Sequence, residues 1–149
     1  EHPRTLTARE ALATAYRLAG RLPEAIRLAS RVTQQRTAVL GPVHPDTLVS
    51  RLGLALARAE DGDLRAAEGI AMPALREAID AHGQHHPVTT ALRSCVGGLH
   101  AAAGRFDEAR EALRYALAGT ERQLGSTHPD AVALREELHM LTPTPTPTP

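Results

Sequence analysis

The feature that most constrains this chain is a His-Pro dipeptide that occurs four times at a constant spacing. Consecutive copies are 42 residues apart, at His2, His44, His86 and His128. Two series of glycines keep the same interval, Gly20, Gly62 and Gly104, and Gly41, Gly83 and Gly125. A period of about 20 to 50 residues is typical of solenoids, propellers and other arrays of like units. The sequence therefore predicts that each interval is one structural repeat.

Each repeat has the pattern of two helices joined by a tight turn. In the first repeat, apolar residues recur at near-helical spacing before Gly20, as at Leu12 and Tyr16, and after it, as at Ile26 and Val32. The turn is too short to reach a parallel neighbour, so the two helices must fold back on each other. Proline suits the first turn of a helix. Each His-Pro pair is therefore predicted to mark the start of a hairpin.

The hairpins are expected to form an all-α, right-handed superhelical solenoid of about seven helices. The predicted array covers residues 1–141, as repeats at about 2–43, 44–85 and 86–127 and a terminal helix at 128–141. Residues 142–149 are four Thr-Pro pairs, which block a helix and favour extended backbone. We interpret them as a linker, with a ligand for a proline-binding module or a phosphorylation target as alternatives. Because the chain starts without Met and already in phase, we expect a piece of a longer protein.

These motifs resemble the tetratricopeptide repeat (TPR). The pattern of that family, Leu-Ala, an aromatic residue, Gly and Ala, is matched by Leu12-Ala13, Tyr16, Gly20 and Ala25. The 42-residue spacing and the phrases LGPVHPDTL and LGSTHPDAV are similar to the kinesin-light-chain type of TPR. That type also occurs in the C-terminal arrays of bacterial STAND (NB-ARC) signalling ATPases. The resemblance implies a protein-binding scaffold and no particular partner, because a fold does not fix a function.

The chain departs from that family at the positions that grip a ligand. The kinesin-light-chain type usually carries an Asn-Asn pair on the concave side of each first helix. Here the pair reads Glu10-Ala11, Leu52-Gly53, Ser94-Cys95 and Glu136-Glu137. The lysine and asparagine clamp for C-terminal carboxylates is also missing, because the chain contains neither residue type. We therefore do not expect the family's usual hold on a peptide backbone.

The resemblance also supplies a candidate binding groove. Its positions map onto Glu10, Thr14, Arg17, Leu52, Leu56, Ser94, Gly98 and Glu136. This groove would have an apolar centre at Leu52 and Leu56 between acidic ends at Glu10 and Glu136. The expected ligand brings an aliphatic or aromatic anchor and basic residues. The alternative to this open groove is that Leu52 and Leu56 pack against a neighbouring helix, which would close it.

Charge and hydropathy exclude several other classes of partner. The 17 arginines balance 17 acidic residues, so no net field favours nucleic acid or an anionic membrane. No apolar run approaches the roughly 18 residues of a spanning helix, and no signal-peptide pattern opens the chain. The single cysteine, Cys95, is compatible with a reducing compartment. We expect a cytoplasmic protein without nucleic-acid or membrane partners.

No catalytic, metal or cofactor site is predicted. His82, His85 and His86 could ligate zinc or nickel, but the HGQHH stretch contains no cysteine or acid to complete the set. Cys95 has no visible activating partner. A ladder of arginines at the repeat interval would either pack over neighbouring hairpins or form a stripe for acidic or phosphorylated peptides, and we favour packing. The ladder is Arg9, Arg51, Arg93 and Arg135.

The sequence thus predicts a non-enzymatic scaffold that binds a peptide or protein in a concave groove. The alternative is an intramolecular sensor, regulatory or assembly module, in which the array packs against an ATPase or effector domain of its own parent chain.

Two further expectations concern packing. Pro73 should kink or interrupt the second helix of the middle repeat. The first hairpin should self-associate weakly through Leu6, Leu12 and Tyr16.

Overall fold

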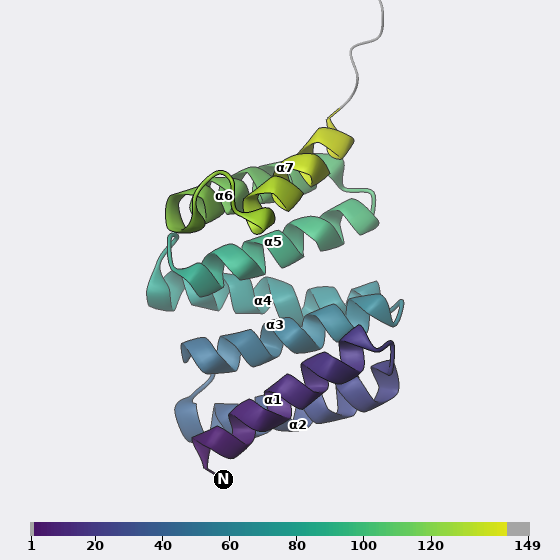
Figure 1. The fold of residues 1–149 in the computed structure, drawn as a ribbon, viewed down its shortest axis with the longest axis vertical. Coiled ribbons are helices and arrows are strands. Elements are labelled where there is room, and N and C mark those ends of the chain that lie inside the picture. Colours follow the sequence, from purple (N-terminus) through teal and green to yellow (C-terminus); the bar gives the residue numbers. More distant parts are fainter. Residues whose placement is uncertain (1, 143–149) are drawn as a thin grey trace, which may run out of the picture.

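A computed structural model describes residues 2–142, which form a stack of antiparallel helix hairpins (Figure 1). The helices are α1 (Pro3–Leu18), α2 (Leu22–Leu40), α3 (Pro45–Glu60), α4 (Leu64–His82), α5 (Pro87–Ala102), α6 (Phe106–Leu124) and α7 (Pro129–Leu141). One layer consists of α1, α3, α5 and α7, and the layer behind it of α2, α4 and α6. The all-α solenoid is confirmed, and the Thr-Pro tail from residue 143 lies outside the described residues.

Each His-Pro pair starts a helix of the first layer, and the histidine itself is the N-cap. The imidazole Nδ1 of each of the four histidines accepts the backbone N–H two residues later, at 3.0–3.1 Å. The proline follows at the first helical position, where a missing N–H leaves nothing unpaired. Gly41, Gly83 and Gly125 end the second helices with φ near +90°, which favours glycine. The dipeptide therefore supplies both a capping acceptor and a preset first turn.

Two contacts between successive hairpins, and a third between the last hairpin and α7, use the same repeat positions with different chemistry. The contact between the first two hairpins is ionic. The guanidinium of buried Arg36 donates to Glu10 Oε2 and to Ser50 Oγ, both at 2.9 Å, and Ser50 Oγ donates to the same carboxylate oxygen at 2.5 Å. In the next contact the equivalent residues are Leu52, Ala78 and Leu92, which lie in or against an apolar cluster. In the third contact they are Ser94, Thr120 and Leu134.

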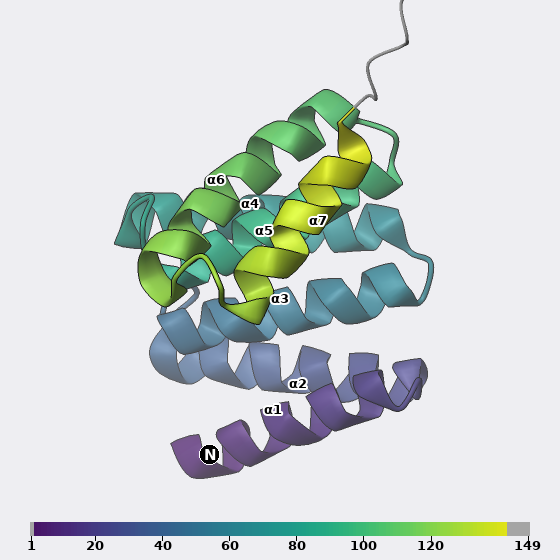
Figure 2. The same cartoon turned by 45° about the horizontal axis from the view of Figure 1, so that its top comes forward.

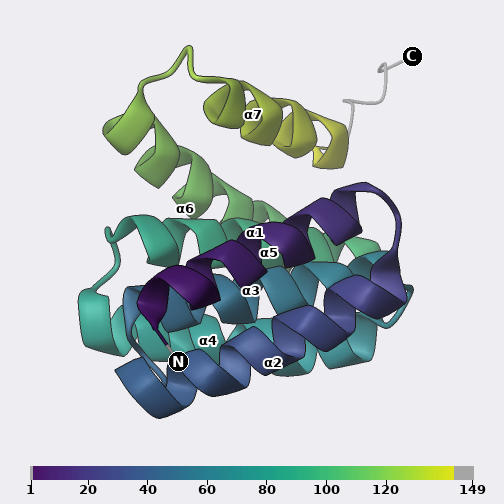
Figure 3. The same ribbon diagram turned by 60° about the horizontal axis from the view of Figure 1, so that its bottom comes forward.

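The third hairpin is packed more closely than the others. A side chain added at Gly119 of α6 would place its Cβ 2.7 Å from Thr90 Oγ1 of α5, and one at Gly97 would meet Leu113 at 2.8 Å. The positions equivalent to Gly119 hold Gln35 and the acidic Glu77 in the earlier hairpins. The terminal helix α7 packs on α6 (Figure 2) and lies apart from the other first-layer helices (Figure 3). A tight hairpin is thus followed by a loosely attached last helix.

Helix α4 is not interrupted at Pro73. It has 19 residues, as do α2 and α6. Pro73 lacks the N–H that would bond to the carbonyl of Gly69, and yet the helix continues on both sides of it. Buried alanines on both sides, Ala71 and Ala74, hold the two halves against their neighbours. The expected interruption is therefore wrong, because one lost hydrogen bond does not end the helix, and the alternative of a kink at Pro73 stays a prediction.

The apolar stripe expected on the first hairpin is not continuous. Leu6 is buried inside its own hairpin, and Tyr16 is half-buried beneath the guanidinium of Arg21, 4.9 Å from the ring centroid. Leu12 alone of the three is well exposed, at 45% of its surface. Weak self-association of this hairpin would therefore depend on Leu12 rather than on a stripe.

The histidine caps should contribute measurably to stability. We expect His44→Ala to lower the free energy of unfolding by about 1 kcal/mol, because the N–H of Asp46 loses its acceptor at the start of α3. The measurement is urea denaturation followed by circular dichroism. The control is His139→Ala, which removes an exposed histidine in the last turn of α7 that caps no helix start. An equal loss in both variants would show that the cap has no special role.

The stability of the contact between the first two hairpins should depend on every member of its ionic network being present. Glu10→Gln is expected to cost about 3 kcal/mol, since it leaves the buried Arg36 guanidinium without a charged partner. The triple variant Glu10→Leu, Arg36→Ala, Ser50→Leu installs the residues of the second contact and should recover most of that loss. Glu77→Gln breaks a partly exposed pair with Arg51 and should cost less than about 1 kcal/mol.

Urea midpoints of these variants provide the comparison. A triple variant no more stable than Glu10→Gln would show that the ionic set is not replaceable by the apolar one.

Candidate functional site

Three pockets lie along the first layer, one between each pair of neighbouring helices. The first pocket, between α1 and α3, has a volume of about 10 Å³. The second pocket, between α3 and α5, has about 430 Å³, and the third, between α5 and α7, has about 760 Å³. The second and third pockets share Ala91 and Ser94 of α5, so they lie side by side along this helix. The surface therefore opens progressively toward α7.

The first pocket is closed by ion pairs. Glu10 lines it, but its carboxylate is held by Arg36 and Ser50. Arg17 donates to Glu60 Oε1 at 2.6 Å and so joins α1 to α3. Thr14 is the one exposed side chain of the three expected here. Three of the expected groove residues, Glu10, Thr14 and Arg17, thus lie where little space is left for a ligand.

The second pocket is apolar and open to solvent. It brings together four of the expected residues, which are Leu52, Leu56, Ser94 and Gly98. Leu52 is half-buried and also packs against the cluster that contains Leu48 and Leu92. Leu56 belongs to no such cluster among the described residues and lies at the surface of the pocket. Both leucines are half-buried and line the pocket, and they differ in that only Leu52 also packs against a core cluster.

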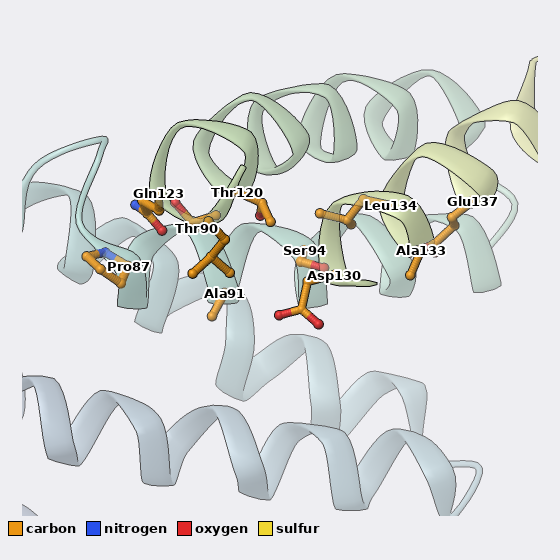
Figure 4. A pocket seen from close by; sticks show the side chains of 11 residues that line it. Pro87, Thr90, Ala91, Ser94, Thr120, Gln123, Asp130, Ala133, Leu134 and Glu137 are labelled. Carbon is orange, nitrogen blue, oxygen red and sulfur yellow. The ribbon is translucent and has the colours of Figure 1, made fainter. Parts of the chain in front are cut away.

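The third pocket combines hydroxyl, carboxylate and apolar groups from three helices. Figure 4 shows Thr90 and Ser94 of α5, Thr120 of α6, and Asp130, Leu134 and Glu137 of α7 around it. Among the described residues that line this pocket there is no arginine or histidine. Its charge is therefore negative.

Glu137 is the acidic residue of α7 that lies in the groove. Its carboxylate oxygen Oε1 is 3.8 Å from the point where a Cβ on Gly98 would lie, so it reaches over α5. Partial burial raises the pKa of the Glu137 carboxyl above its usual range. The expected residue, Glu136, lies on another face of α7 beside Val132 and Met140. Glu136 was expected by analogy with Glu10 and Leu52, which line the pocket toward the following helix, but no helix follows α7 among the described residues. The equivalents of Glu137, Gly53 and Cys95, do line pockets, so the repeat alignment contained the signal.

The histidines of the HGQHH stretch all have other partners. His82 Nε2 lies 2.6 Å from the carbonyl oxygen of Val43, His86 caps α5, and His85 Nδ1 lies 2.8 Å from Arg122. Within residues 2–142, no group of three or more histidine, cysteine or acidic side chains is placed to hold a metal ion. Burial raises the pKa of the Cys95 thiol to about 11, so this thiol stays protonated at neutral pH.

The arginine ladder makes intramolecular contacts throughout. Arg51, Arg93 and Arg135 each donate to the backbone carbonyl nine residues earlier. Arg51 and Arg135 also pair with Glu77 and Glu121, and Arg93 lies 5.0 Å above the ring of Tyr115. Arg9 donates to the side chain of Gln35. These contacts support the packing interpretation over a stripe for acidic peptides.

No helix between residues 2 and 142 combines the length and the apolar character that crossing a membrane requires.

Comparisons with known proteins agree with this architecture. Models of the tetratricopeptide repeat match residues 4–76 and 89–130. Curated protein sequences give no match. The TPR-like repeats of a kinesin-light-chain protein from Podosopora anserina superpose with a TM-score of 0.85 at 28% identity, over 95% of this chain and 67% of that one. A single-residue variant of that protein gives a TM-score of 0.84 at the same identity, over 95% of this chain and 66% of that one.

A more distant neighbour supports the fold alone. BtubC (BKLC) from P. vanneervenii has a TM-score of 0.78 at 18% identity, over 91% of this chain. The chain spans about two thirds of the Podosopora protein and 54% of BtubC. The repeat spacing, the stacked hairpins and the family matches agree, and the chain belongs to the tetratricopeptide-repeat family, with an array of the kinesin-light-chain type.

Proposed function

We propose that this protein is a non-enzymatic scaffold that binds an extended segment of a protein partner in the groove formed by the second and third pockets. Tetratricopeptide repeats support a role in protein–protein interaction. The observation that carries the proposal is the second pocket, an apolar pocket with a volume of about 430 Å³ that neighbouring helices leave open. Of the two predicted arrangements, the open groove is the one that this surface supports at Leu56.

The apolar lining favours a partner with an aliphatic or aromatic anchor. Leu56 lies at the surface of the pocket, with Leu64 beside it and Leu99 on the facing helix. Gly98 adds no side chain, so the partner can approach the backbone of α5 closely. A few apolar contacts of this kind dominate the binding energy of most interfaces. Leu56 is therefore the residue that best reports on occupancy of the groove.

The partner is either a separate protein or another domain of the same parent chain. In the second case the array would act as a sensor, regulatory or assembly module of a larger STAND-type ATPase or effector, with a flanking segment in the same groove. We expect no cofactor, nucleic-acid or membrane partner and a cytoplasmic location.

Weak self-association through the first hairpin would use Leu12, which is exposed. Analytical ultracentrifugation should show that this association is lost in the Leu12→Ser variant.

The test is a peptide-display selection on the 149-residue chain, followed by titration of the selected peptides. Leu56→Asp should weaken their binding at least tenfold, because it places a charge in the apolar pocket. Its urea midpoint should change little, since Leu56 is outside the core clusters of the described residues. The control is Val39→Asp, at a position of α2 with 52% exposure and no part in the groove.

Selection of no apolar-anchored peptide, or equal binding by the Leu56→Asp variant, would contradict the proposal. Unfolding of that variant would show that Leu56 belongs to the core and that the groove is misassigned.

A further inference from the structure

We infer that the third pocket is a recognition site for a basic side chain, arginine above all, carried by the segment that occupies the groove. The inference rests on the proposed function and adds the chemistry of the partner to it. Three observations support it: the loss of apolar filling between α5 and α7, the unpaired carboxylate of Glu137 on α7, and a comparison with the ionic contact of the first two hairpins.

The third pocket exists because polar residues replace an apolar set. Between α3 and α5 the gap is filled by Leu48, Leu52 and Val88. Their equivalents, 42 residues later, are Thr90, Ser94 and Asp130, which all line the third pocket. Thr90 in turn lies close against α6, at a point where only a glycine, Gly119, leaves room. The gap between α5 and α7 is therefore left unfilled, with polar groups at its walls.

Of the two carboxylates of this pocket, that of Glu137 has no cationic partner in the described part of the chain. Glu137 makes no ion pair or hydrogen bond with its side chain among the described residues. Asp130 has one neighbour of possible positive charge, His128, 3.7 Å away, and that Nδ1 already accepts the N–H of Asp130. Partial burial of an unpaired carboxylate opposes its ionisation, as the raised pKa of Glu137 indicates. Unpaired groups of this kind are concentrated at functional sites.

The first contact between hairpins shows what such a pocket accepts. There the guanidinium of Arg36 lies between Glu10 on one helix and Ser50 and the carbonyl of Asp46 on the next. In the third contact the position of Arg36 holds Thr120, so the chain supplies no guanidinium. Carboxylate and hydroxyl groups are still present there, at Glu137, Asp130 and Ser94. A ligand arginine would replace the missing cation, with its stem against Leu134.

The position of Glu137 links this pocket to the apolar one. Ser94 lines both pockets, and the Glu137 carboxylate lies over Gly98, which lines the second. Neighbouring packed helices are about 8–10 Å apart, and an extended segment advances about 3.3–3.6 Å per residue. If an apolar residue of the ligand contacts Leu56, the ligand residue about three positions away would therefore lie beside Glu137.

The probe is the fluorescein-labelled peptide RASLASR, in which an arginine stands three positions before and three positions after the central leucine. The comparison peptides are QASLASQ, EASLASE and RASSASR. Fluorescence polarisation with the 149-residue chain should show RASLASR binding about tenfold more tightly than QASLASQ, and EASLASE more weakly still. Glu137→Gln should remove most of that preference. The matched control, Glu136→Gln, changes the adjacent residue on another face of α7 and should keep the preference within about twofold.

A second variant tests the pocket without changing its charge. Ser94→Leu installs the residue found at Leu52 and should fill the gap, so the preference for arginine should also fall. Glu137→Gln should not lower the thermal midpoint of the free protein, because the carboxylate is unpaired. A lower midpoint would indicate a structural role and overturn the inference.

Other outcomes separate this inference from the proposed function. If Glu136→Gln and Glu137→Gln lowered the preference for arginine equally, the effect would come from the overall negative charge of α7, and the site would be overturned. Tight binding of EASLASE, or no measurable binding of RASLASR, would overturn it as well. If the leucine of the peptide still matters while arginine gives no advantage, the groove stands and only the basic site fails. If RASSASR binds as well as RASLASR and Leu56→Asp has no effect, the proposed function itself fails.

Discussion

The structure depends on how one hairpin meets the next, because a two-helix hairpin cannot bury its apolar face alone. Each of these contacts is decided by the same repeat positions. Glu10, Arg36 and Ser50 join the first pair of hairpins through a charge network, and the equivalent residues of the second contact are aliphatic. The third contact has hydroxyls at two of the positions and remains open. A constant backbone repeat thus carries three different interfaces.

The shape of the groove follows from these interfaces. Ion pairs across α1 and α3 leave almost no space, aliphatic packing between α3 and α5 leaves an apolar surface around Leu56, and polar residues between α5 and α7 leave the widest opening. Gly119 contributes from the far side, because it lets α6 and α5 approach closely while α7 stays apart. Small substitutions at repeat positions therefore turn a uniform solenoid into a graded binding surface.

The sequence predicted what local chemistry controls and missed what packing controls. Helix starts follow from His-Pro and helix ends from glycine, since both act through the nearest turn. Local rules predicted a kink or an interruption at Pro73, and the interruption is wrong because such rules carry no information about the buried alanines on both sides of it. The capping role of histidine was missed because proline alone explains the start. Glu137 was missed because Glu136 was chosen by analogy with positions that face a following helix, and no helix follows α7 among the described residues.

A net charge of zero does not describe how this chain would meet a partner. Its arginines are largely occupied within the fold, as Arg36, Arg51 and Arg135 illustrate through their bonds to carboxylates and backbone carbonyls. Pairing of this kind removes cations from the surface of the groove without changing the overall balance. One carboxylate that remains unpaired, that of Glu137, lines the third pocket and is partly buried there, so solvent screens it less than it screens a fully exposed charge. Specificity of a neutral scaffold therefore depends on which charges the fold leaves unpaired.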